Sequence, residues 1–230
     1  MLLTPRRRRG FEHLDDPETD PAVRERSLQD VRVSNRLLGG AHAVLSEFNR
    51  LLPSLGSEAT MLDVGTGLAD IPAQARALAA RRDVRLLTLG VDEAETLARV
   101  TGDILDGSAC ADARHLPFGD SSVDVVICSQ VLHHFDDGEI PAVLRELDRV
   151  ARRVVIVSDL RRSWVAASGF WAVSWPMGFH PVTRHDGVAS VLRGFSASDL
   201  GAHVRAATGR VADIHRHLGW RLTATWSPST

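Results

Sequence analysis

The chain contains no tyrosine among its 230 residues and only two cysteines. Without tyrosine, no phenolic hydroxyl is available as a general acid or base. Cys110 and Cys128 lack C-x-x-C spacing and fall on predicted buried strands, which favours small core residues in a reducing compartment. No set of histidine, cysteine, aspartate and glutamate has metal-ligand spacing, so no metal site is predicted.

Sequence features of several other protein classes are also missing. There is no G-x-S-x-G, which excludes the nucleophile elbow of α/β-hydrolases. A net charge of -2 gives no reason to expect binding to nucleic acid. The basic run Arg6–Arg9 is followed by Glu12, Asp15 and Asp16 instead of an apolar core, so it is not a secretory signal. We therefore expect residues 1–21 to be a flexible tail and the protein to be cytoplasmic.

The most informative segment is M-L-D-V-G-T-G-L-A-D-I-P, residues 61–72. An apolar strand ends near Asp63, and a glycine-rich turn then opens a predicted helix, where free backbone N–H groups and a positive dipole end would face a ligand. Gly65 and Gly67 allow close approach to the backbone. A dinucleotide site would have a glycine in place of Asp70, and the two carboxylates would repel a pyrophosphate. The turn therefore favours a cationic ligand without phosphate.

Short apolar runs alternate with helical patterns along the rest of the chain, which indicates an α/β protein with a parallel sheet and helices on both faces. The predicted strands are 60–64, 85–91, 107–110, 123–128 and 153–158, followed by a hairpin at 210–217 and 219–226. The predicted helices are 22–38, 41–52, 70–82, 93–101, 138–150 and 197–208, the last with Ser196 and Asp199 as a capping box. Ligands of such sheets bind at the carboxyl ends of the strands.

Four segments together resemble the motifs of class I methyltransferases that use S-adenosylmethionine (SAM). They are D-V-G-T-G at 63–67, L-L-T-L-G-V-D at 86–92, and the third- and fourth-strand motifs within residues 111–135. The most similar subgroup methylates quinones and polyketides. The resemblance implies a Rossmann-like, seven-stranded, mostly parallel sheet with one antiparallel strand. It also implies one domain over 22–230, in which an N-terminal helical cap (22–55) covers the cofactor.

The resemblance also implies which residues bind SAM. Asp63 would orient the glycine loop and the methionine amine, Asp92 would accept hydrogen bonds from the ribose hydroxyls, and Asp112 would face the adenine amine. The full set of expected cofactor-binding residues is Asp63, Gly65, Thr66, Gly67, Asp92, Asp112, Ala113 and Ser129. Ala69 stands where the family often has a third glycine.

Residues 159–195 are predicted to form an apolar lid over the acceptor. No charged residue occurs between Arg162 and Arg184, and Trp164, Trp171 and Trp175 align on one face of a helix that Pro176 should end. Serine, glycine and proline interrupt the stretch, so no stable membrane insertion is expected. The tryptophans either pack as a core helix or cover an apolar or aromatic acceptor.

Three histidines are the predicted catalytic bases: His133 and His134 after the fourth strand, and His185 beside Asp186. Each could take a proton from a hydroxyl during methylation. In the family one histidine of L-H-H often packs structurally, and the segment around His185 could equally be a surface loop.

Together these features predict a SAM-dependent methyltransferase that acts on a hydroxyl of a small aromatic, polyketide-like or quinone-like acceptor, as a monomer or homodimer. One alternative is methylation of a ring carbon, and another is a SAM-fold binding protein without activity. A nucleic-acid methyltransferase fits less well, because the fourth strand ends in S-Q-V-L instead of N/D-P-P-Y/F.

Overall fold

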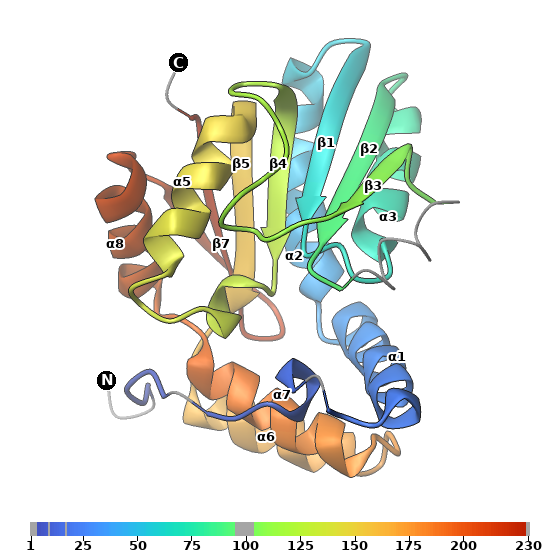
Figure 1. The fold of residues 1–230 in the computed structure, drawn as a ribbon, viewed down its shortest axis with the longest axis vertical. Helices are drawn as coiled ribbons and strands as arrows, with labels where there is room; N and C mark the ends of the chain where they lie inside the picture. The colour runs from blue at the N-terminus through green and yellow to red at the C-terminus, as the bar shows by residue number, and fades with distance from the viewer. Residues whose placement is uncertain (1–3, 9, 17, 95–103, 229–230) are drawn as a thin grey trace.

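A computed structural model describes residues 4–8, 10–16, 18–94 and 104–228 (Figure 1). Seven strands form one sheet in the order β3-β2-β1-β4-β5-β7-β6. Their bounds are β1 Glu58–Val64, β2 Arg85–Asp92, β3 Gly107–Cys110, β4 Val123–Ser129, β5 Ala151–Leu160, β6 Asp213–His217 and β7 Arg221–Trp226. β7 alone runs in the direction opposite to the other six strands, so the predicted sheet and C-terminal hairpin are confirmed.

Helices cover both faces of the sheet, because alternate strand residues point to opposite sides. Leu62, Val126 and Val155 pack on one side with α5 (Ile140–Val150) and α8 (Ala197–Thr208). Met61, Val125 and Ile156 pack on the other with α2 (Gly40–Leu51) and α3 (Asp70–Ala80). Every residue of β4 is buried as a result. Burial raises the pKa of the Cys128 thiol well above its usual value, which leaves it a core residue. Cys110 is exposed, so its predicted core position was wrong, because β3 is an edge strand.

A cap of helices lies beyond the carboxyl ends of the parallel strands (Figure 1). It consists of α1 (Pro21–Leu37), α6 (Trp164–Ser174) and α7 (Pro181–Arg193). Three short 3-10 helices, η1 (His13–Asp15), η2 (Leu52–Ser54) and η4 (Leu132–His134), complete the described elements. The predicted helix 93–101 falls mostly on residues outside the described ranges. None of the described helices is long and apolar enough to cross a membrane.

The segment around His185 lies in a helix, α7, and not in the surface loop that the sequence left open as an alternative. His180 caps its N-terminus by accepting a hydrogen bond from Val182 N, and Pro181 occupies the first turn, where proline favours a helix. The glycine at 187 permits close packing, since an added Cβ would lie 2.0 Å from the ring of Phe170 on α6. The local capping residues and this contact make the segment helical.

The stretch expected to be a flexible tail includes an N-terminal strap, residues 4–8 and 10–16, that packs on the cap. Asp186 accepts hydrogen bonds from His13 N and Leu14 N, each at 3.0 Å. Glu12 is only 3% exposed and accepts from Arg193 Nη1 at 2.9 Å. These partners come from α7, far along the sequence, which is why local composition gave no indication of them.

The C-terminal hairpin is in close contact with the junction between α1 and α2. A Cβ on Gly219 would lie 1.8 Å from the carbonyl oxygen of Leu38, and a Cβ on Gly39 would lie 3.1 Å from that of Leu218. Both glycines have positive φ, which residues with a side chain adopt at a cost. The edge of the sheet therefore fixes the end of the first cap helix.

The tryptophans of α6 are not core residues, so the core-helix interpretation was wrong. Trp164, Trp171 and Trp175 are all exposed, whereas Ala166, Ala167 and Ser174 are the buried residues of α6. Small side chains face α7 because α6 and α7 pack closely around Phe170 and Gly187. The tryptophans lie beside this contact, where Arg184 of α7 stacks on Trp175.

The backbone conformation at Ala69 explains why glycine is common at this position in the family. It has φ +56° at the N-cap of α3, and its side chain is fully buried. An L-residue in the left-handed region costs roughly 1 kcal/mol. The alanine is accommodated at the cost of backbone strain.

We predict that Ala69→Gly changes the free energy of unfolding by less than about 0.5 kcal/mol, because the relief of about 1 kcal/mol of backbone strain offsets the loss of one buried methyl group and the added freedom of the unfolded chain. Chemical denaturation measures the change. Ala73→Gly, at an exposed position within α3, is the matched control and should lower stability by about 0.5–1 kcal/mol. Equal losses in both variants would contradict the strain at Ala69.

Candidate active site

The glycine-rich turn after β1 does not offer all its N–H groups to a ligand. Gly65 N and Thr66 N both donate to the carbonyl oxygen of Val91, at 2.8 and 3.0 Å. Gly67 N donates to Asp92 Oδ2 at 3.0 Å. The expectation of free N–H groups is therefore wrong for these three residues, because β2 and its terminal carboxylate lie against the turn. A turn whose donors are used in this way is a poor phosphate site.

Gly65 and Gly67 have positive φ but different surroundings. A Cβ on Gly65 would lie 2.2 Å from Val131 Cγ2, so the turn packs directly against the segment after β4. A Cβ on Gly67 would meet no atom within 4 Å. Open space therefore lies above Gly67, where a ligand could approach the backbone.

Asp63 is a buried carboxylate at the end of β1 with an incomplete set of partners. It is 2% exposed; Thr66 Oγ1 donates to Oδ2 at 3.2 Å, and Oδ1 has no hydrogen-bond partner. Burial raises the pKa of Asp63 to about 8; the Thr66 hydrogen bond opposes the rise, and Asp70 and Asp92 add to it. A ligand ammonium group would satisfy the unpaired oxygen and favour the charged carboxylate.

Asp92 and Asp112 occupy the ends of the next strands with their carboxylates already engaged by protein donors. Asp92 accepts from Gly67 N and Ala94 N, and each oxygen keeps a second lone pair. Asp112 forms an ion pair with Arg114 at 2.8 Å, and the hydrogen bonds from that side chain hold the pKa of Asp112 below its ordinary value. The neighbouring Ala113 is partly buried against the core.

The carboxyl end of β4 connects the cofactor side of the site to α1. Ser129 is buried, and its hydroxyl has no hydrogen-bond partner. Gln130 has φ +59° and donates from Nε2 to Asn35 Oδ1 of α1 at 2.6 Å. Its Oε1 accepts from Arg221 Nη1 at 2.7 Å. α1 is thus attached to the strand ends.

These features fit SAM, which carries an amine, a sulfonium and a ribose but no phosphate. The unpaired Asp63 Oδ1 and the open space above Gly67 are the two observations that support the fit. The N–H groups of Gly65, Thr66 and Gly67 donate within the protein and are therefore not available to bind a phosphate, which is consistent with a ligand that has none.

A buried histidine–aspartate pair lies next to this turn. His133 Nδ1 is 2.7 Å from Asp159 Oδ1 at the end of β5, and His133 N donates to Asp159 Oδ2 at 3.1 Å. Burial would raise the pKa of Asp159, but the charge and hydrogen bond of His133, with Leu160 N, hold it below its ordinary value. The pair fixes the imidazole ring through Nδ1 and leaves Nε2 directed away from Asp159.

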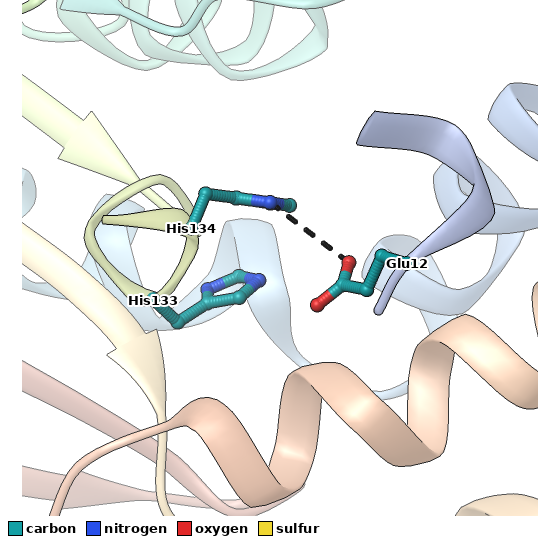
Figure 2. A group of neighbouring side chains, drawn as sticks. All are labelled: Glu12, His133 and His134. Carbon is teal, nitrogen blue, oxygen red and sulfur yellow. Dashed lines mark ion pairs between the residues drawn. The ribbon is translucent and has the colours of Figure 1, made fainter. Parts of the chain in front are cut away.

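Glu12 of the strap faces both histidines after β4 (Figure 2). One potential ligand atom from each of Glu12, His133 and His134 lies within 4.8 Å of the others. Glu12 Oε2 is 3.9 Å from His134 Nδ1, and Oε1 accepts from Arg193. Two imidazoles and a carboxylate could hold a transition metal. However, Arg193 already balances the Glu12 charge, and a guanidinium this close opposes a second cation.

His185 lies in a different group from the other predicted bases. Its Nδ1 is 3.0 Å from Asp186 Oδ1, and its ring centroid is 5.0 Å from that of His13. Its side chain is half exposed. The structure therefore brings His133 and His134 together at the strand ends. It places His185 elsewhere, beside Asp186 of the same helix α7 and His13 of the strap.

A cavity of about 630 Å³ lies between α6, α7 and the strap. Phe11, Trp171, Trp175, Arg184 and His185 are among its lining residues. Phe11 lines this cavity while the adjacent Glu12 faces His133 and His134. The strap thus separates the cavity from the two histidines.

Glu12, Asp159 and Arg193 were not found from the sequence. Asp159 follows an apolar strand in the same way as Asp63 and Asp92, and this pattern could have identified it. Glu12 and Arg193 carry no comparable local pattern, because they reach the site only through the packing of the strap on α7.

Comparisons with known proteins agree with this geometry. Residues 62–157 match the family described as a methyltransferase domain, and no curated protein matches the chain. A SAM-dependent methyltransferase from Aquifex aeolicus has a similar structure: TM-score 0.59, 15% identity, 92% of this chain and 100% of that one covered. Magnesium protoporphyrin IX methyltransferase from Synechocystis, solved with bound SAM, gives a TM-score of 0.54 at 15% identity, with 94% and 88% covered.

At these identities the structural likeness establishes the Rossmann-like fold. The domain match covers the strands that carry the glycine-rich turn, Asp92, Asp112 and the L-H-H segment. Residues 62–157 therefore form a methyltransferase domain, and the whole chain has the fold of SAM-dependent methyltransferases.

Proposed function

We propose that the enzyme methylates a hydroxyl of a small aromatic, polyketide-like or quinone-like acceptor, with His133 as the base. The observation that carries the proposal is the buried His133–Asp159 pair at 2.7 Å, directly after the strand that packs on the glycine-rich turn. The proximity is supported by Val131, which contacts Gly65 and lies two residues before His133.

Asp63, Gly65, Thr66, Gly67, Asp92, Asp112, Ala113 and Ser129 are proposed to form the cofactor site. Asp63 would bind the amine of the methionine moiety through its unpaired Oδ1. Asp92 would accept the ribose hydroxyls with the lone pairs that Gly67 N and Ala94 N leave free. When bound, SAM supplies an electrophilic methyl group on a sulfonium.

The protein's own chemical contribution is small in such a transfer. It holds the acceptor oxygen in line, excludes water and removes one proton. Asp159 accepts the hydrogen bond from His133 Nδ1, which presents Nε2 as the acceptor of the hydroxyl proton. After proton transfer the buried Asp159 carboxylate would stabilise the imidazolium. His134 is the second member of the site and is proposed to contact the acceptor.

The character of the acceptor is inferred from the burial of His133 and from the family resemblance. The His133 side chain is 4% exposed and Glu12 of the strap faces it, so a hydroxyl bound at its Nε2 would be shielded from water. The cavity lined by Phe11, Trp171 and Trp175 lies on the other side of the strap and is not assigned to the acceptor. A compact aromatic or quinone-like molecule is what the resemblance implies.

Incubation with methyl-labelled SAM and a panel of phenols, hydroxylated polyketides and quinols tests this function. We expect label in an ether methyl group, identified by its carbon-13 shift. Label in a ring methyl group would show carbon methylation instead. Absence of transfer to every hydroxylated ring, in a protein that binds SAM, would contradict the proposed acceptor class.

His133→Gln removes the base, while Asp159 keeps its hydrogen bonds from the backbone N of residue 133 and from Leu160 N. We predict that its kcat falls by about 10²–10⁴-fold while SAM affinity changes little. Calorimetry with SAM and single-turnover kinetics measure the two quantities. His185→Gln is the matched control on α7 and should keep kcat within about threefold. A His133→Gln enzyme with normal kcat would rule out the proposed base.

The raised pKa of Asp63 predicts how stability depends on pH in the SAM-free protein. Between about pH 4 and 8 the folded state keeps a proton that the unfolded chain loses, so the free energy of unfolding falls as pH rises. Asp63→Asn should remove this slope and raise stability at pH 8 by about 1–3 kcal/mol. It should also weaken SAM binding about tenfold or more.

Urea unfolding at pH 5 and pH 8 and calorimetry with SAM check both parts of this prediction. Asp120→Asn is the control, because that carboxylate is 81% exposed. An unchanged slope in Asp63→Asn, or SAM affinity equal to that of the parent protein, would show that Asp63 is not the amine ligand.

A further inference from the structure

Helix α6 is apolar around its whole circumference, yet only one side of it is packed. Ala166, Ala167 and Ser174 face the protein. The rest of its circumference, which we call the tryptophan face, exposes Trp164 (38%), Val165 (44%), Trp171 (54%), Val173 (44%) and Trp175 (56%). A helix of this kind is normally buried, and a contiguous apolar surface indicates an interaction site.

The tryptophan face continues onto the strap and into the neighbouring cavity. Phe11 is 58% exposed and lines the cavity of about 630 Å³ together with Trp171 and Trp175. Figure 1 shows α6 at the end of the molecule beyond the strand ends, next to the strap. The apolar surface therefore spans two segments of the cap and includes an open groove.

Two arginines from separate elements stack on the rings of this surface. The guanidinium of Arg8 lies 4.9 Å from the ring centroid of Trp164, and that of Arg184 lies 3.9 Å from Trp175. Arg26 of α1 is paired with Asp30 at 3.3 Å, and Asp30 accepts from His180 N, so this pair adds no net charge. Residues 163–183 contain no aspartate or glutamate. The surface is thus apolar with a positive rim.

We propose that the tryptophan face docks on a lipid bilayer whose headgroups are anionic. Tryptophan favours the boundary between headgroups and acyl chains, and arginine favours anionic headgroups there. With 11 residues, α6 is about 16 Å long, too short to cross a bilayer, so it lies in the plane of the interface. The proposal does not depend on which acceptor is methylated.

A second copy of the chain is a less suitable occupant of this face. A two-fold contact would place the tryptophan faces together and bring Arg8 and Arg184 near their symmetry mates. No acidic residue within 163–183 could offset that repulsion. Anionic headgroups would pair with the same arginines.

Vesicle sedimentation with the full chain tests the proposal, using phosphatidylcholine vesicles with and without phosphatidylglycerol. We expect binding to the anionic vesicles, weakened by added salt. The double variant Trp171→Ser/Trp175→Ser should lower the partition coefficient about tenfold or more. Val211→Ser/Leu218→Ser is the matched control, since both residues are exposed and apolar but lie outside α6, and it should bind like the parent.

A second pair of substitutions separates charge from apolar burial. Arg8→Gln/Arg184→Gln should lower binding to anionic vesicles about tenfold and leave any weak binding to neutral vesicles unchanged. Circular dichroism and SAM affinity verify that each variant is folded.

Three outcomes would overturn the proposal. The first is a parent protein that does not bind anionic vesicles. The second is a folded tryptophan variant that binds them as well as the parent does. The third is a dimer in sedimentation equilibrium that the tryptophan substitutions dissociate, which would assign the face to a second copy.

Discussion

The burial of carboxylates at the carboxyl ends of the strands is the constraint on which the site depends. Asp63 and Asp159 are both removed from water, but only Asp159 has enough partners within the protein. His133 and Leu160 N stabilise its charged form, while Asp63 keeps an unpaired oxygen. A buried charge without a partner is costly. One carboxylate therefore positions a side chain, and the other is available to a cationic ligand.

Arginines connect the cap to these strand ends and give it a defined position. Arg193 of α7 pairs with Glu12 and donates to the His134 carbonyl oxygen at 2.9 Å. Arg162, after β5, donates to the carbonyl oxygens of Pro5 and Gly194, each at 2.7 Å. These bonds join the strap, α7 with the turn after it, and η4. His133 is consequently enclosed by segments that lie far apart in the sequence, whereas His134 is exposed.

The fold, and the strand ends that carry the proposed cofactor residues, could be predicted because their patterns are local. Apolar runs ending in Asp63 and Asp92, with glycines between them, mark strand ends without knowledge of the tertiary structure. The acceptor side depends on contacts between distant segments. Glu12 meets His133 only after the strap folds over α7, and a basic, polar beginning gave no indication of that packing. The tryptophans of α6 have helical spacing, but spacing alone cannot distinguish a buried side from an exposed one.

The contact of the C-terminal hairpin with the α1–α2 junction has a consequence for the order of folding. Gly219 closes against Leu38, and Arg221 reaches Asn35 through Gln130. The first helix of the cap thus rests on a hairpin that lies far from it in the sequence. Contacts between such distant segments close long loops and form late in folding. The parallel strands can therefore pair before α1 is fixed over their carboxyl ends.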